Sequence, residues 1–234
     1  MSYKYRQVVF DIETYGLPFD DLSESQQEYL LRDAEKEQDP VLREKKTEDA
    51  KGLMALFPFT AKVIVIGFYI VDSGKTVVLY ETPDGSDERI TENDITYVGS
   101  DEKKLIENFW RMAAETQQLI SFNGRGFDAP FMMLRSAKLG IKPSKNLVGY
   151  RYDTREHCDL LEQLSFYGAF RRFNLDFYCY SFGIVSPKSK GISGIDVKNF
   201  YEAGKIREVA RYCADDVRAT HELFKIWENY INIK

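Results

Sequence analysis

Short runs of β-branched and aromatic residues recur along the chain with the length of buried strands. They are VVFDI (8–12), AKVIVIGFYIV (61–71), KTVVLYET (75–82), QLISF (118–122) and LVGYRY (147–152). Such residues favour strands, and runs of this length bounded by turn residues are typical of a buried sheet. Only DSG separates the second run from the third, which predicts a β-hairpin.

Other stretches carry apolar residues at helical spacing. In DEKKLIENFWRMAAET (101–116) they recur every three or four positions, and Asp101 is placed to cap the first turn. In DAPFMMLRSAKLG (128–140), Pro130 falls in the first turn and Gly140 at the end. Further helices are expected near 159–167, 174–182, 196–203 and 205–229. An initial hairpin followed by alternating strands and helices predicts one α/β domain over 1–234, with a mixed sheet of five to six strands flanked by helices.

Two carboxylates, Asp11 and Glu13, stand at the end of the first apolar run. Side chains at i and i+2 of a strand point to the same face, so the two acids lie side by side. Their mutual repulsion and any burial raise the cost of keeping both ionised. A cation between the acids would offset this cost. Taken alone, however, the pair is explained more simply by a solvated strand end.

Two later segments carry further polar groups at element boundaries. In NGRGFD, Asn123 follows the strand at 118–122 and Asp128 opens the next helix. In YCADDVRAT, Tyr212 and Asp216 are at i and i+4 on one helical face, while Asp215 lies about 100° around the helix. Each feature alone has an ordinary structural explanation as a helix cap, a turn residue or a solvated helix face.

Together, and in this order, the three segments resemble the three motifs of the DnaQ-like 3′–5′ exonucleases, the DEDD superfamily with the ribonuclease H-like fold. These motifs are Asp-x-Glu, Asn-x₂₋₃-aromatic-Asp and Tyr-x₃-Asp. The matching residues are Asp11, Glu13, Asn123, Phe127, Asp128, Tyr212 and Asp216. Tyrosine in the third motif marks the DEDDy branch. Over residues 5–18 and 60–230 the sequence most resembles the stand-alone exonucleases related to proofreading domains of family-B DNA polymerases.

The resemblance implies a ribonuclease H-like fold and a two-metal-ion hydrolysis of phosphodiester bonds. Asp11, Glu13, Asp128 and Asp216 would hold two Mg²⁺ or Mn²⁺ ions, which prefer oxygen ligands. Asp11 would bridge both ions, and Tyr212 would orient the attacking water. The expected activity is release of nucleoside 5′-monophosphates from 3′ ends of single-stranded DNA. A 3′–5′ exoribonuclease or oligoribonucleotide-trimming role and a catalytically silent nucleic-acid-binding module are the alternatives.

Substrate contacts are expected from five residues in or beside the motifs: Thr14, Asn123, Phe127, Lys188 and Lys190. The two lysines belong to the loop SPKSKGISG (186–194), for which a plain flexible loop is the alternative. FYGAFRRFN (166–174) interleaves arginines with phenylalanines, a pattern compatible with base stacking and phosphate contact. Here we expect the aromatic rings in the core and the arginines at the surface.

The stretch from about 20 to 56 is a highly charged insert between the first and second strands, outside the resemblance. Its composition favours one or two exposed helices. Its position directly after Glu13 suggests a cover beside the acids, and an exposed surface for a protein partner is the competing interpretation.

The composition of the chain limits its possible core size, its binding partners and its cellular compartment. The chain has 234 residues, of which 44% are apolar and 14% aromatic, enough for one substantial core. Its net charge of −5 combines −10 over 1–123 (14 basic, 24 acidic) with +5 over 124–234 (18 basic, 13 acidic), which permits a phosphate-facing second half. Three cysteines without a Cys-x-x-Cys pair suggest a reducing compartment. Because no run spans a bilayer and MSYKYRQ lacks a signal-peptide pattern, we expect a cytoplasmic protein that does not contact membranes.

Overall fold

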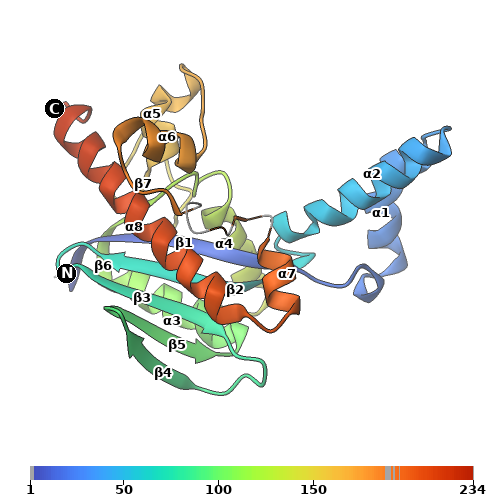
Figure 1. Cartoon of the computed structure of the whole chain (residues 1–234), viewed down its shortest axis with the longest axis horizontal. Coiled ribbons are helices and arrows are strands. Elements are labelled where there is room, and N and C mark those ends of the chain that lie inside the picture. The colour runs from blue at the N-terminus through green and yellow to red at the C-terminus, as the bar shows by residue number, and fades with distance from the viewer. Residues whose placement is uncertain (1–2, 188–190, 192, 195, 234) are drawn as a thin grey trace.

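The computed structural model describes residues 3–187, 191, 193–194 and 196–233, and its centre is a seven-stranded mixed sheet (Figure 1). The strand order is β4-β5-β3-β2-β1-β6-β7. β1 pairs antiparallel with β2 and parallel with β6. The strands are β1 (Tyr5–Gly16), β2 (Ala61–Ile70), β3 (Lys75–Glu81), β4 (Glu88–Glu92), β5 (Ile95–Ser100), β6 (Thr116–Ser121) and β7 (His157–Asp159). This α/β arrangement has the ribonuclease H-like fold expected from the sequence.

Helices cover both faces of the sheet (Figure 1). α3 (Glu102–Glu115) and α4 (Asp128–Lys138) pack on one face, where they share a core with β1 and β2. The long helix α8 (Ile206–Tyr230) crosses the other face. The shorter helices packed on the α8 side are α5 (Leu160–Leu164), α6 (Leu175–Phe182) and α7 (Val197–Glu202). A 3₁₀ turn, η3 (Phe166–Gly168), follows α5.

The alternation of side chains along β1 decides which face receives the two acids. Val8, Phe10 and Ile12 enter the core formed with α3 and α4. Asp11 and Glu13 therefore project to the opposite face, toward α8. The pairing of β1 with β2 shifts its register between Glu13 and Thr14, directly after the second acid. The strand thus presents both carboxylates on one face just before its regular pairing is interrupted.

The sheet differs from the sequence prediction in four places, because β4, β5 and β7 were not predicted and the segment 147–152 is not a strand. The sheet therefore has seven strands where five to six were expected. Every residue of β4 is exposed, which leaves no hydrophobic alternation to read. The prediction of a strand at 147–152 is wrong. That segment forms turns and exposes Tyr150 and Tyr152, and the edge of the sheet is instead the three-residue β7.

The charged insert forms a helical hairpin of α1 (Glu24–Glu35) and α2 (Pro40–Gly52). A 3₁₀ turn, η1 (Phe19–Asp21), leads into the hairpin. The two helices pack on each other and project away from the sheet (Figure 1). The hairpin therefore does not cover the acids, and that prediction is wrong. An exposed surface for a protein partner stays a prediction. A second 3₁₀ turn, η2 (Leu53–Leu56), returns the chain to the body, where Met54 is buried.

Among the helices of the described residues, none combines the length and the apolar composition that crossing a bilayer requires.

Candidate active site

Helix α8 approaches β1 and β2 closely because a glycine faces it. Gly67 of β2 is the register partner of Asp11 of β1. A Cβ atom at Gly67 would lie 2.8 Å from the Cys213 Sγ atom and 3.2 Å from the Cys213 carbonyl oxygen, both on α8. Only a residue without a side chain allows this contact, because real Cβ atoms do not approach so closely. Gly67 therefore allows the turn of α8 that carries Tyr212, Cys213 and Asp216 to pack closely against the sheet.

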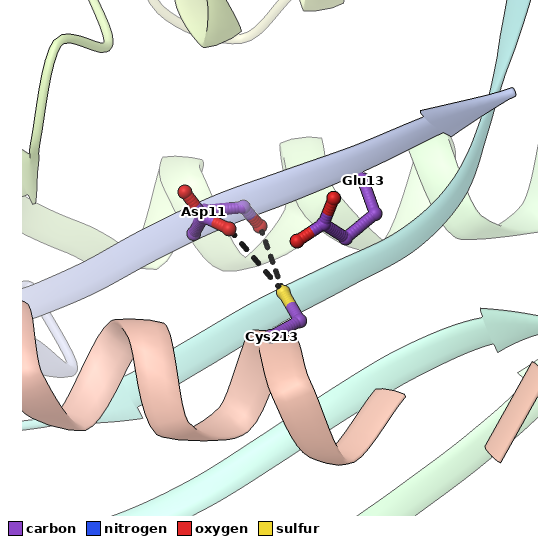
Figure 2. A group of neighbouring side chains, drawn as sticks. All are labelled: Asp11, Glu13 and Cys213. Carbon is purple, nitrogen blue, oxygen red and sulfur yellow. Dashed lines mark hydrogen bonds between the residues drawn. The ribbon is translucent and has the colours of Figure 1, made fainter. Parts of the chain in front are cut away.

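Asp11, Glu13 and Cys213 converge at this contact, where Figure 2 shows both carboxylates on the side of β1 that faces α8. One oxygen of each acid and the Cys213 sulfur all lie within 4.8 Å of one another. The Cys213 thiol donates to the Asp11 Oδ2 atom at 3.6 Å and to the Asp11 carbonyl oxygen at 3.7 Å. Burial, followed by the nearby acids, raises the pKa of Cys213 well above its usual range. The sulfur is therefore a protonated donor that positions Asp11, and not a ligand for a hard cation.

Asp128 joins the group from the first turn of α4. Its Oδ1 atom accepts a hydrogen bond from the Ile12 backbone N–H at 3.0 Å, which ties the start of α4 to the strand between the two acids. The cap position of α4 belongs to Phe127, and no side chain caps the helix. Asp128 is buried, and this burial raises its pKa to about 7, against the effect of its backbone hydrogen bonds. The simple capping role that the sequence also allowed is therefore not what the side chain does.

Tyr212 and Asp216 lie on one face of α8, as their spacing predicted. Both line a cleft of about 450 Å³ together with Asp11 and Asn123. The Tyr212 phenol hydrogen-bonds to Asp216, and its pKa lies far above the usual range because of burial and then repulsion by Asp216, Glu13 and Asp11. Tyr212 therefore stays protonated near neutral pH and acts as a hydrogen-bond donor.

The acids of the site repel one another. Burial is the largest cause of the raised pKa of Asp11, followed by repulsion from Asp128, Asp216 and Glu13. The pKa of Glu13 is raised well above its usual range by burial and then by Asp216 and Asp128. Within the described part of the chain, no Lys or Arg forms an ion pair with Asp11, Glu13 or Asp128. Such an arrangement of carboxylates is suited to bind a divalent cation.

Asp159 holds the loop that carries Asn123, a role that sequence analysis missed. Its two carboxylate oxygens accept from the backbone N–H groups of Asn123 and Arg125, each at 2.9 Å. The same side chain caps α5 by accepting from Leu161 N–H at 2.9 Å. Asn123 adopts a left-handed conformation (φ 63°), which Asn tolerates better than most residues. The only sequence signal for this second role was an acid at the end of a short segment before a helix.

The remaining residues singled out in the sequence lie in different surroundings or outside the described residues. The Thr14 hydroxyl donates to the Ala55 carbonyl oxygen at 2.7 Å and so anchors η2. The Phe127 ring packs against Phe131 at 5.6 Å between ring centroids, beside the core. Lys188 and Lys190 lie outside the described residues. Asp215 faces away from the cleft, as predicted, and lines a separate groove of about 900 Å³.

Comparison with known proteins assigns the family. Residues 69–230 match the family described as predicted 3′–5′ exonucleases related to the exonuclease domain of PolB. The chain belongs to this family. Its members are hydrolases that act on nucleic acid, and their exonuclease domains are generally dependent on divalent metals. The match includes Asn123, Asp128, Tyr212 and Asp216, whereas Asp11 and Glu13 precede it.

Relatives of known function are DNA polymerases. The DNA polymerase of Thermococcus sp. (strain 9oN-7) is 30% identical over 172 residues, which cover 63% of this chain and 21% of the polymerase. That of Thermococcus gorgonarius is 32% identical over 154 residues, covering 56% of this chain and 19% of the polymerase. The structure of the family B DNA polymerase from Pyrobaculum calidifontis shares the fold, with a TM-score of 0.60 and 19% identity over 96% of this chain and 24% of that one. The matches thus span only about a fifth of the curated relatives.

Proposed function

We propose that this exonuclease domain removes nucleotides one at a time from the 3′ end of single-stranded DNA and releases nucleoside 5′-monophosphates. The observation that carries the proposal is the group of acids on β1, α4 and α8, of which Glu13, Asp128 and Asp216 are buried and Asp11 is partly buried. No Lys or Arg of the described residues forms an ion pair with Asp11, Glu13 or Asp128. In a family of 3′–5′ exonucleases, a divalent cation is the natural counter-charge for such a group.

Asp11, Glu13, Asp128 and Asp216 would hold two Mg²⁺ or Mn²⁺ ions. The donor set fits these hard cations because every proposed ligand is a carboxylate, and the one thiol at the site stays protonated. When bound, the ions would supply an activated water and stabilise the charge that develops on the phosphate. Their charge would also remove the repulsion that raises the pKa values of Asp11 and Glu13.

The protein groups around the acids would position the reactants. Tyr212, protonated and hydrogen-bonded to Asp216, would donate to the attacking water or to a phosphate oxygen and set its direction. Cys213 would hold the Asp11 carboxylate through its thiol hydrogen bond. Asn123, fixed by Asp159 and facing the cleft, would contact the terminal nucleotide.

The sugar of the substrate is the finer part of the proposal. DNA is favoured because the relatives of known function are DNA polymerases. A 3′–5′ exoribonuclease would use the same carboxylates, since the acids contact phosphate and not the sugar. A catalytically silent binding module would retain nucleic-acid affinity without hydrolysis.

A degradation assay tests the proposal. Single-stranded DNA, duplex DNA and RNA of the same sequence, each labelled at the 5′ end, are incubated with the protein in Mg²⁺, Mn²⁺ or EDTA. We expect a metal-dependent ladder that shortens from the 3′ end, fastest on single-stranded DNA and absent in the double variant Asp11→Asn/Glu13→Gln. The matched control, Asp20→Asn/Asp21→Asn, removes two acids from the exposed turn η1 and should retain activity. If the wild-type chain degrades no strand, the proposed hydrolysis is wrong; if RNA is preferred, the substrate assignment is wrong.

A further inference from the structure

The segment 172–176, which runs from the loop after η3 into the first turn of α6, lines the cleft that contains the acids. Arg172, Phe173 and Asp176 line the same cleft as Asp11 and Tyr212. The sequence pattern of this region suggested buried rings and surface arginines. The structure instead exposes Phe166 (59%) and Phe170 (63%), so the expectation that the rings of 166–174 lie in the core is wrong for these two. Phe177, which lies beyond that segment, is also exposed (50%).

Phe173 and Phe177 form a stacked pair that starts in the cleft and ends in solvent. Their ring centroids are 4.2 Å apart and their planes are within 8° of parallel. Phe173 is half-buried and lines the cleft, whereas Phe177 presents an exposed ring on α6. A nucleobase can extend such a stack because every base has a π-face, which makes the contact tolerant of sequence.

Two arginines, Arg171 and Arg172, directly precede Phe173 in the chain. The Arg171 guanidinium lies 5.2 Å from the centroid of the Phe173 ring. Both Arg171 and Arg172 are exposed, and neither forms an ion pair with a carboxylate of the residues that the structure describes. Asp176, the acid of the same segment, accepts a hydrogen bond from the Ser186 hydroxyl. The two arginines are therefore available to pair with phosphate groups.

Arg172 also connects the cleft to a second recess. A hollow of about 220 Å³ is lined by Arg125, Arg151 and Arg172 together with Asn123. The Arg125 and Arg151 side chains pair with Glu162 at 3.3 and 2.8 Å, and Asp159 also lines this recess. Arg172 lines both hollows and forms no such pair with a carboxylate of the described residues.

We propose that Phe170, Arg171, Arg172, Phe173 and Phe177 form an aromatic–arginine surface that binds the single-stranded substrate upstream of its 3′-terminal nucleotide. Bases stack on the exposed phenyl rings while the two guanidinium groups neutralise the phosphates between them. The occupant is a flexible single strand, because stacking on these rings requires bases that are unpaired and free to splay. This inference rests on the proposed function and extends the same site.

Binding measurements separate this surface from the hydrolysis itself. The probe is a fluorescein-labelled 12-nucleotide DNA whose 3′ linkages are phosphorothioates, which resist cleavage, and its binding is followed by fluorescence anisotropy across a salt series. Phe177→Ala/Arg172→Gln should weaken binding at least tenfold, on the order of the loss of one stacked base. It should also flatten the slope of log K against log salt by about 0.7, as expected for one lost phosphate contact on a single strand.

A matched control tests whether the effect is local. The Arg32 guanidinium lies 4.2 Å from the centroid of the Tyr29 ring on the projecting helix α1. Tyr29→Ala/Arg32→Gln removes the same two kinds of side chain and should leave the affinity and the salt slope unchanged. Thermal unfolding of each variant verifies that the fold is retained.

The outcomes distinguish the surface from the proposed hydrolysis. Equal affinity and equal salt slope in wild type and in Phe177→Ala/Arg172→Gln would overturn the surface, even if the wild type shortens an ordinary strand. Weaker binding in that variant would support the surface, even if the wild type cleaves nothing and the hydrolysis is wrong. A wild-type chain that does not bind the probe would overturn both.

Discussion

Two groups of buried charge in this protein are built in opposite ways. Glu102 and Arg135 join α3 to α4 through two hydrogen bonds of 2.8 Å each, and Glu102 also accepts from the Val63 backbone N–H. Their side chains are only 12% and 7% exposed, but each charge meets its opposite. Glu13 and Asp128 are also buried and Asp11 is partly buried, but these acids repel one another. A balanced pair holds elements together, whereas an unbalanced group of acids is suited to bind a cation.

The largest expected effect follows from changing one acid of the unbalanced group. Asp11→Asn should reduce exonuclease activity on the order of 10⁴-fold, comparable to the loss of a central catalytic group. The metal-free protein should become more stable, because the substitution removes a charge that is repelled by Glu13, Asp128 and Asp216. Steady-state kinetics and urea unfolding in EDTA measure the two effects. Loss of stability together with activity would assign Asp11 a structural role instead.

Removing one partner of the Glu102–Arg135 pair should have the opposite effect: the stability should fall and the activity should be retained. Arg135→Met leaves Glu102 buried with a single backbone donor, so the free energy of unfolding should fall by about 3–5 kcal/mol. Activity per folded molecule should be retained, since the pair does not line the cleft. The exposed ion pair between Lys36 and Asp33 offers the control, and Lys36→Met should leave unfolding unaffected. Equal effects of the two substitutions would refute the distinction between buried and exposed pairs.

His157 is a buried titratable group that is kept neutral, which gives a test in pH. Its Nδ1 atom lies 2.8 Å from the Leu147 carbonyl oxygen and must donate, so its Nε2 atom accepts from the Ser121 hydroxyl at 2.7 Å. Burial lowers its pKa to about 4 from an ordinary 6.5. Because protonation favours the unfolded chain, its contribution to stability is complete above pH 6.5 and is lost as the pH falls toward 4, by roughly 3 kcal/mol.

The comparison of wild type with His157→Gln isolates this contribution. The acids with raised pKa values act in the opposite direction, since their cost to the metal-free fold grows as the pH rises through the folded pKa. The difference between the two proteins removes that common background. We expect urea unfolding in EDTA to show a wild-type advantage that shrinks between pH 6.5 and 4. A constant difference over this range would mean that His157 does not titrate as described.

The smallest expected effect concerns the hydroxyl group of Tyr212. Tyr212→Phe keeps the ring on α8 and removes the donor that bonds to Asp216. We expect kcat to fall about 10- to 100-fold with little change in KM, because a hydrogen bond that orients the reactants acts mainly in the transition state. Initial-rate kinetics on a labelled strand measure both constants. A rise in KM at constant kcat would place the hydroxyl in substrate binding.

The parts of the fold that depend on local sequence patterns could be predicted from the sequence. The alternation in VVFDIET placed Asp11 and Glu13 on one face of β1, and helical spacing placed Tyr212 with Asp216 and turned Asp215 away. The hairpin of β2 and β3 followed from two apolar runs joined by a short turn. Each of these features depends on neighbours within a few residues.

The features that were missed depend on contacts distant in sequence or on weak patterns. The bonds from Asp159 to the loop at Asn123 join residues 36 apart, and Gly67 acquires its role only when α8 packs on it. β4 carries no apolar alternation, and the three residues of β7 are too few to form one. The direction of the α1–α2 hairpin depends on its junction at η2 and not on the composition of its helices.

Calorimetric titration of Mn²⁺ into the metal-free protein tests the central claim most directly. The account predicts that the wild-type chain binds two ions, and that Asp11→Asn, which removes one of the proposed ligand carboxylates, loses most of this affinity. Asp20→Asn, at an exposed acid of η1, should bind as the wild type does. Absence of Mn²⁺ binding to the wild type, or equal binding by wild type and Asp11→Asn, would contradict a metal site built on the acids of β1.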